Sequence, residues 1–240
     1  MLLVALIGCD ARSESGSPAA PPREALKTGA GVIRGTVKFI GTPPMMSKIR
    51  VEPCHDGASG EIADESVVVN ANGTLRNVFV YVEGAGRGDG SAEQPVMLDQ
   101  VNCTYVPHAL GVQVGQTLTV RSGDPTIHNV HFLADRNRAT NFGLTGAGQQ
   151  KRLAFAETEF IPVKCDVHPW MLAYIGVFEN PYFAVTGEDG AFELARLPAG
   201  RLKLIAWHER YGRLEQDVTT EQANSTAVTF EYRGPQASGK

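Results

Sequence analysis

The sequence predicts an all-β protein. Its 240 residues include 26 glycines and 14 prolines. Many short valine-rich runs lie between turn residues, which is the pattern of short strands joined by tight turns. No long stretch has the periodicity of an amphipathic helix. A chain of this length has room for two modest domains, or for one domain that carries a large insertion.

The N-terminus predicts export. Residues 1–9 are apolar and end in the run LIGC at residues 6–9, after which the chain turns polar. This run resembles the lipobox of bacterial lipoproteins, which implies a signal peptide over residues 1–9 and a lipid on Cys9. The apolar run is too short to span a bilayer and no positively charged region precedes it, so we expect a truncated start. The alternative is a clipped ordinary signal peptide with an incidental Cys9.

Residues 10–30 are rich in serine, proline, alanine and glycine, a composition typical of a disordered linker. A lipid on Cys9 would hold the chain at a membrane through acyl chains worth about 0.8 kcal/mol per buried methylene. We therefore expect a protein of the periplasm or cell envelope, with its folded part tethered to the membrane through this linker.

Strand signals begin after the linker. Residues 31–41 alternate between apolar and polar side chains and end at Thr-Pro-Pro, which stops a strand. Residues 66–69 and 75–82 flank Asn72-Gly73, a pair typical of a tight hairpin turn. A glycine-rich loop over residues 84–94 then separates these strands from the next part of the chain.

Residues 112–120 alternate around Gly115, and they are followed by the segment DPTIHNVHF at residues 124–132. This pattern predicts a strand, a turn and a second strand. The second strand contains His128 and His131, whose side chains point to opposite faces of a sheet because strand side chains alternate. Only one of the two histidines can therefore serve a site on a given face.

The most informative stretch is CDVHPWM at residues 165–171, which places a thiolate, an imidazole and a thioether on one turn. A soft thiolate holds Cu(I), an imidazole accepts both oxidation states of copper, and a weak axial thioether raises the potential. The set suits copper and lacks one equatorial histidine. His128 is the candidate for that ligand. Asn129 is the candidate for a hydrogen bond that ties its loop to the cysteine loop.

The order of these features resembles that of the cupredoxins, the type 1 copper proteins of the amicyanin and plastocyanin kind. The likeness covers about residues 95–178. It rests on Tyr105, Leu110, Gly115, the run HNVHF at residues 128–132, and the two-residue gaps of residues 165–171 with proline after the histidine. One departure is Ile127, which stands where amicyanin-like members have proline.

This resemblance implies a Greek-key β-sandwich that binds one type 1 copper ion. The implied equatorial ligands are His128, Cys165 and His168, and the implied axial ligand is Met171. His168 would come nearest to the surface of the protein. Pro169 and Trp170 would form the edge where electrons enter and leave.

Other readings of residues 165–171 stay open. A cysteine near a histidine is often structural, and Met171 is of a type that fills cores. Structural zinc prefers several cysteine or histidine ligands and rarely uses a thioether. A Cys-His nucleophilic pair fits the spacing but has no use for Met171. We do not expect His108, His131 or His208 to bind metal.

The remaining cysteines are Cys54 and Cys103. In an oxidising compartment, the simplest interpretation is a disulfide between them. Closing a loop of that length would stabilise the fold by about 4 kcal/mol. The competing reading is a second metal site at residues 53–56, Pro-Cys-His-Asp, which lacks the regular spacing of residues 165–171.

Residues 182–207 resemble the carboxypeptidase regulatory-like domain, a transthyretin-type β-sandwich. The likeness is carried by Asp189, Gly190, Phe192, Leu194, Pro198 and Gly200. Residues 31–39 resemble the opening strand of the same domain. We therefore expect a smaller, discontinuous sandwich made of residues 31–94 and 180–235, with a cupredoxin-like copper domain of residues 95–179 inserted in it. The alternative is two domains in series.

The sequence thus predicts a cell-envelope blue copper protein that is not an enzyme and that carries single electrons between redox proteins, such as a cytochrome c or a dehydrogenase. A net charge of −4 and a pI near 5.9 argue against a nucleic-acid partner. The alternative is a periplasmic copper carrier or store without a redox role. A copper enzyme would need further histidines, and an adhesion module would have no use for four ligand types.

Overall fold

The computed structural model describes residues 29–50, 54, 60–86, 94–222 and 224–234. Cys9, most of the predicted linker, and His55 and Asp56 of the alternative metal site lie outside the described residues. The described part contains eighteen strands and no helix, so the all-β prediction is confirmed. That part of the chain accordingly contains no helix with the length and apolar character needed to cross a membrane.

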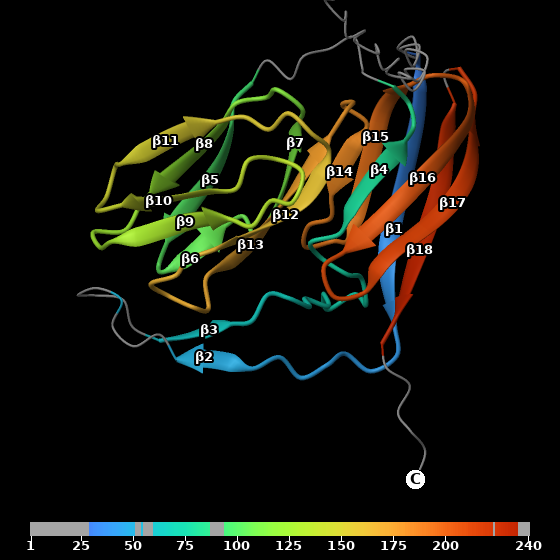
Figure 1. Cartoon of the computed structure of the whole chain (residues 1–240). Coiled ribbons are helices and arrows are strands. Elements are labelled where there is room, and N and C mark those ends of the chain that lie inside the picture. The colour runs from blue at the N-terminus through green and yellow to red at the C-terminus, as the bar shows by residue number, and fades with distance from the viewer. Residues whose placement is uncertain (1–28, 51–53, 55–59, 87–93, 223, 235–240) are drawn as a thin grey trace, which may run out of the picture.

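The strands between residues 96 and 178 form two sheets, which we call the central sandwich (Figure 1). The five-stranded sheet has the order β10 (Thr140–Leu144), β9 (His128–Phe132), β12 (Glu159–Lys164), β13 (Leu172–Phe178) and β7 (Ala109–Gln113). The four-stranded sheet has the order β11 (Gln150–Leu153), β8 (Leu118–Ser122), β5 (Val96–Val101) and β6 (Thr104–Val106). Both sheets contribute to one buried core, with residues such as Leu98, Val120, Phe132 and Ile161.

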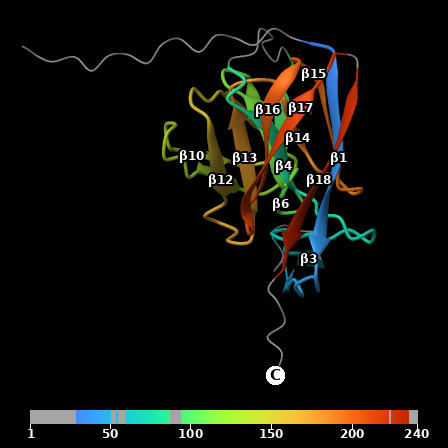
Figure 2. The same cartoon turned by 90° about the vertical axis from the view of Figure 1, so that its right-hand side faces the viewer.

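The other long strands come from both ends of the described chain and form the outer sandwich (Figures 1 and 2). Its three-stranded sheet has the order β15 (Ala191–Leu197), β1 (Gly31–Ile40) and β18 (Ser225–Arg233). Its four-stranded sheet has the order β14 (Phe183–Val185), β4 (Phe79–Glu83), β16 (Gly200–His208) and β17 (Gly212–Thr220). In β1, Ile33, Val37 and Phe39 face the core that both sheets share, as period-two alternation requires.

A separate two-stranded ribbon consists of β2 (Lys48–Arg50) and β3 (Glu61–Ala63). In Figure 1 it lies below the central sandwich, at the end where the loop between β12 and β13 also lies. Each strand of the ribbon pairs only with the other among the described residues. Its attachment to the central sandwich includes a disulfide from Cys54, which lies between the two strands.

Aromatic side chains join the two sandwiches. Phe79 of the outer sandwich is fully buried, and its ring lies 5.3 Å from Phe160 and 6.1 Å from Phe178 of the central sandwich, measured between centroids. Trp207 of the outer sandwich stacks on Phe160 with 4.0 Å between centroids. A buried contact between the Nε2 of His108 and the carboxylate of Glu209 also crosses this junction. The two sandwiches therefore share an apolar interface that also contains this polar contact.

The hairpin expected around Asn72-Gly73 is shorter than predicted. Gly73 has a φ of 79°, as this turn requires, but the backbones of the arms pair through a single bridge, between Val69 and Leu75. Asn77 then adopts a φ of 63°, which interrupts the extended chain, and β4 begins at Phe79. The backbone N–H of Leu75 donates instead to the carbonyl of Val37 in β1. The second arm thus bonds to the outer sandwich before the kink.

Candidate metal centre

Two neighbouring segments carry the predicted metal ligands. His128 is the first residue of β9, and the loop of residues 165–171 joins β12 to β13. This loop is closed at its base by pairing of Lys164 with Leu172 and by a hydrogen bond from the Cys165 N–H to the Met171 carbonyl. Since β12 pairs with β9, the loop comes to lie beside His128. The sheet register thereby places residues 40 positions apart next to each other.

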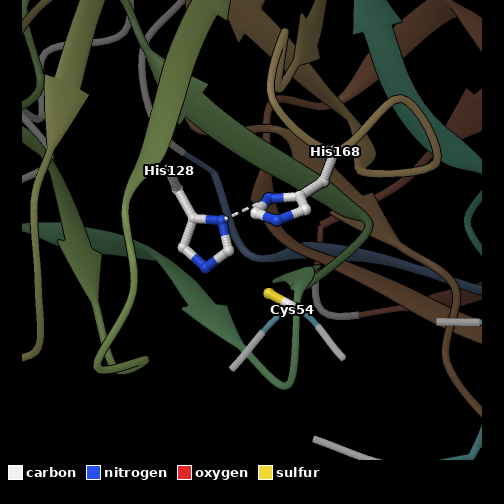
Figure 3. A group of neighbouring side chains, drawn as sticks. All are labelled: Cys54, His128 and His168. Atoms are coloured by element: carbon white, nitrogen blue, oxygen red, sulfur yellow. Dashed lines mark hydrogen bonds between the residues drawn. The ribbon is translucent and has the colours of Figure 1, made fainter. Parts of the chain in front are cut away.

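The two imidazoles face each other through their Nδ1 atoms. The Nδ1 atoms of His128 and His168 are 3.0 Å apart, and the Sγ of Cys165 is 3.8 Å from the Nδ1 of His168 (Figure 3 shows the rings). Metal–nitrogen and metal–sulfur bonds are about 2.0 and 2.3 Å long. Both separations are shorter than the sum of two such bonds. The donor atoms therefore fit around a single ion.

All four predicted ligands are buried. Met171 and Cys165 are each 1% exposed and His128 is 0% exposed, whereas His168 is 8% exposed. His168 is therefore the ligand candidate nearest to the surface. Pro169 next to it is exposed, and the ring of Trp170 lies 5.2 Å from the ring of His168.

The surroundings of Cys165 favour its ionised form. Burial opposes the thiolate, but hydrogen bonds from His128 and from three backbone N–H groups outweigh this effect and lower the pKa of the thiol. One of these donors, the N–H of His168, lies 3.4 Å from Sγ. Because the thiolate is the form that binds metals, the loop prepares Cys165 for that role.

The two histidines differ in their surroundings. Burial and the nearby ring of His128 lower the pKa of His168, which favours the neutral, ligating form of that ring. For His128, burial acts in the same direction, but hydrogen bonds to Cys165 and Asp124 outweigh it and raise the pKa. The Nε2 of His128 lies 2.9 Å from the carboxylate of Asp124, so its Nδ1 is the atom turned toward His168.

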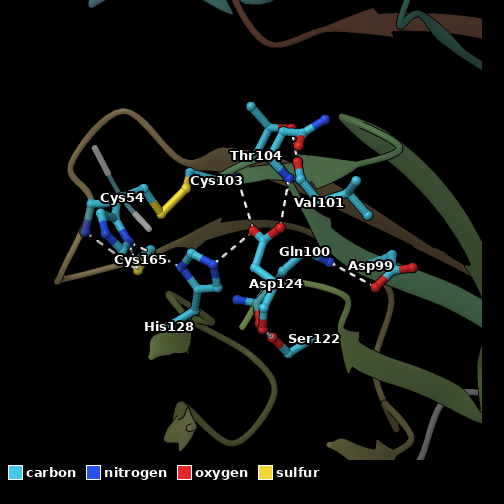
Figure 4. Close-up of polar contacts among 12 residues, drawn as sticks. Cys54, Asp99, Gln100, Val101, Cys103, Thr104, Ser122, Asp124, His128 and Cys165 are labelled. Carbon is cyan, nitrogen blue, oxygen red and sulfur yellow. Dashed lines mark hydrogen bonds and ion pairs between the residues drawn. A yellow bond between two sulfur atoms is a disulfide. The ribbon is translucent and has the colours of Figure 1, made fainter. Parts of the chain in front are cut away.

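Asp124 is the site residue that sequence reasoning missed. Its carboxylate accepts hydrogen bonds of 2.8 Å from the backbone N–H groups of Asn102 and Cys103, in addition to its contact with His128 (Figure 4). Burial raises the pKa of this carboxyl, but these hydrogen bonds outweigh it and keep the pKa low. Its role could have been inferred from its position four residues before His128, because the ring of a ligand histidine usually has a hydrogen-bond partner that orients it.

Asn129 links the two ligand segments. Its side-chain oxygen accepts a short hydrogen bond from the backbone N–H of Asp166, and its amide N–H donates to the Asp166 carboxylate over 2.8 Å. On the opposite face of β9 from His128, His131 also contacts Asp166, with 3.1 Å between Nδ1 and the carboxylate. His208, in contrast, accepts a hydrogen bond from the backbone N–H of Arg210 through its Nδ1.

The predicted disulfide between Cys54 and Cys103 is present, and it borders the ligand cluster. The sulfur of Cys54 and ring nitrogens of His128 and His168 all lie within 4.8 Å of one another. Trp170 reinforces this arrangement, because its indole N–H donates to the carbonyl of Cys103 over 2.9 Å. The disulfide thus borders the candidate metal centre, which its sequence position did not indicate.

Replacing Asp124 with asparagine should weaken Cu(II) binding by about 10- to 100-fold, the range found when a partner of a ligand histidine is changed. The variant loses the carboxylate that fixes the orientation of the His128 ring. Competition with a chelator of known affinity measures the change. Asp217→Asn on β17, an exposed residue paired with Arg201, is the control and should bind copper like the wild type. Equal affinities for the two variants would contradict this role.

The chain matches no family model, and no curated protein matches it. Among solved structures, it is similar to the Cu-containing nitrite reductase of Thermus scotoductus SA-01, with 23% identity, a TM-score of 0.34, and coverage of 36% of this chain. The match spans only 23% of the reductase. An amicyanin variant shares 27% identity over 36% of this chain and 85% of its own, with a TM-score of 0.32. A purple cupredoxin from Nitrosopumilus maritimus shares 21% identity over 35% of this chain and 99% of its own, with a TM-score of 0.30.

Proposed function

We propose that this chain is a type 1 copper protein that carries single electrons between redox partners. The observation that supports this proposal is the convergence of three donor atoms, the Nδ1 atoms of His128 and His168 and the Sγ of Cys165. Met171, buried at the end of the same loop, would supply the fourth, thioether donor in this proposal. A thiolate, two imidazoles and a weak thioether are the donor set of blue copper sites.

Copper bound here would supply a one-electron couple, Cu(I)/Cu(II). The protein contributes a frame that keeps the ligands in place in both states, which lowers the reorganisation that accompanies each transfer. Asp124 holds the His128 ring, Asn129 holds the cysteine loop, and the N–H of His168 stabilises the sulfur of Cys165. Asp124 and Asn129, which are not ligands, therefore fix the two ligand segments from outside the donor set.

The proposed electron-transfer edge lies at His168. Pro169 is exposed beside this ligand, and Val167 and Ile127, which directly precede the two ligand histidines, are each 49% exposed. Apolar side chains around a ligand edge suit a redox protein, such as a cytochrome c or a dehydrogenase, that docks over a small interface and leaves quickly. We further propose that lipidation of Cys9 holds the protein at a membrane of the cell envelope.

The direct test is the visible and electron paramagnetic resonance spectrum of the protein loaded with Cu(II). The wild type should show the intense blue absorption of a thiolate–Cu(II) bond, and Cys165→Ser should lose it completely. His131→Gln is the matched control, because His131 lies on the opposite face of β9 from His128. This variant should keep the colour.

A colourless wild-type protein with a tetragonal Cu(II) signal would overturn the proposal of electron transfer. Tight Cu(I) binding in that protein would then favour a periplasmic copper carrier or store. Loss of colour in His131→Gln together with retention in His128→Gln would reverse the assignment of the histidine ligand.

A further inference from the structure

The disulfide beside the metal centre holds two further sulfur donors. Cys54 lies within 4.8 Å of ring nitrogens of both His128 and His168, while Cys103 lies within the same distance of Asp124 and His128. In the disulfide, neither sulfur is a thiolate, so neither offers the charge that binds metal ions strongly. Figure 3 shows Cys54 pointing toward the space beside the two rings. Its position matters for metal binding once the bond to Cys103 is broken.

We propose that reduction of the Cys54–Cys103 disulfide converts the metal centre into a Cys2His2 site for a closed-shell ion, Zn(II) or Cu(I). The four donors are Cys54, Cys165, His128 and His168. This inference uses the same histidines as the proposed copper site, but it does not require that site to transfer electrons.

The disulfide-bonded and the reduced protein should prefer different metal ions, because they offer different donor sets. With the disulfide formed, the centre has one thiolate, two imidazoles and a thioether, a set that serves both copper oxidation states. With Cys54 free, a second thiolate joins the two imidazoles. Two sulfur and two nitrogen donors are one of the usual sets for tetrahedral zinc, and an additional thiolate also favours Cu(I). Reduction should therefore shift the site away from Cu(II).

The geometry indicates how a reductant reaches the disulfide. Cys54 is partly exposed, whereas Cys103 is fully buried. A thiolate of an external dithiol attacks the Sγ of Cys54, forms a mixed disulfide with it, and releases Cys103 as a thiolate. The second thiol of the reductant then displaces Cys54. The protein gains two electrons and two protons, and the reductant becomes a disulfide.

Structural links connect the disulfide to the ligands. The carboxylate of Asp124 accepts hydrogen bonds from both the backbone N–H of Cys103 and the Nε2 side of His128. The indole of Trp170, in the ligand loop, holds the carbonyl of Cys103. These contacts keep the backbone of Cys103 in place without the disulfide, and Cys54 itself packs against the buried core of the central sandwich.

Two single variants of the full chain provide a matched test. Cys103→Ser and Cys54→Ser both remove the disulfide, so both lose its stabilising effect. Both variants keep Cys165. Cys103→Ser also keeps a thiol within 4.8 Å of both ligand histidines, whereas Cys54→Ser keeps the buried thiol of Cys103, which lies within that distance of His128 and Asp124. Co(II) is the spectroscopic probe, because its thiolate charge-transfer absorption increases with the number of bound thiolates. Chelator competition measures Zn(II) affinity.

Reduced wild type and Cys103→Ser should give about twice the charge-transfer absorption of oxidised wild type and Cys54→Ser. Their Zn(II) affinity should be higher by at least about tenfold, which corresponds to about 1.4 kcal/mol. Equal spectra and affinities for Cys103→Ser and Cys54→Ser would overturn the proposal. Should either variant fail to fold, the comparison of reduced with oxidised wild type remains, and equal spectra and affinities for these two forms would overturn the proposal.

This outcome is separable from that of the copper proposal. Blue colour in the oxidised protein tests electron transfer, and it does not depend on Cys54. If the oxidised protein is blue but its thiolate absorption does not increase upon reduction, only the present inference is wrong. If the oxidised protein is colourless but the thiolate absorption does increase, only the proposal of electron transfer is wrong.

Discussion

Replacing both Cys54 and Cys103 with serine should lower the free energy of unfolding by about 4 kcal/mol, because the bridge restricts a long loop in the unfolded chain. The two cysteines are 49 residues apart. The bridge also attaches the ribbon of β2 and β3, whose strands pair only with each other among the described residues. Urea unfolding of the metal-free protein, followed by circular dichroism, measures the change.

Each single serine variant should lose as much stability as the double variant, because either substitution removes the same bond. Reduced wild type should behave like the double variant and serves as the chemical control. A loss below about 1 kcal/mol would mean that the unfolded chain is already compact near this loop, so the bridge would restrict little of its freedom.

Phe79→Ala should lower the free energy of unfolding by about 3–5 kcal/mol, the range for truncation of a buried phenylalanine. Phe79 is fully buried at the junction, where its ring contacts Phe160 and Phe178 of the central sandwich and Trp207 of the outer sandwich. The variant leaves a cavity between the two halves. Denaturant unfolding followed by tryptophan fluorescence and circular dichroism measures the loss.

Phe79→Leu is the control for this prediction. It retains an apolar side chain and most of the volume, so it should cost less than Phe79→Ala. Equal stability of Phe79→Ala and wild type would show that the junction contributes little and that the two sandwiches unfold independently.

The features that depend on local alternation were predictable from the sequence. Strand β9 was predictable from the alternation of its apolar positions. The same alternation separates His128, which faces the core, from His131, which faces outward. Likewise, Gly115 and Gly190 adopt positive φ at turns, where a residue without a side chain is favoured. Copper chemistry could be proposed because residues 165–171 carry three donor types at short spacing.

The features that depend on long-range packing were not predictable. Asp124 meets Asn102 and Cys103 only because the β5–β6 turn folds beside it. No spacing rule marks a carboxylate whose donors lie more than twenty residues away. The position of the disulfide against the histidines depends on how the ribbon of β2 and β3 lies on the central sandwich. Asn77 interrupts the strand predicted over residues 75–82, because it adopts a left-handed backbone conformation. The alternation of apolar and polar residues does not reveal such a kink.

The parallel pairing of β1 with β18 has a consequence for the order of folding. Val32 lies next to Ser225, and Ile40 next to Arg233, so this contact closes a loop of nearly the whole described chain. Loop closure of this length is entropically costly and slow. The strands between residues 96 and 178 pair among themselves, so we expect them to form an early folding unit. The outer strands would then assemble around an already structured insert, and ligand geometry would be established before the molecule is complete.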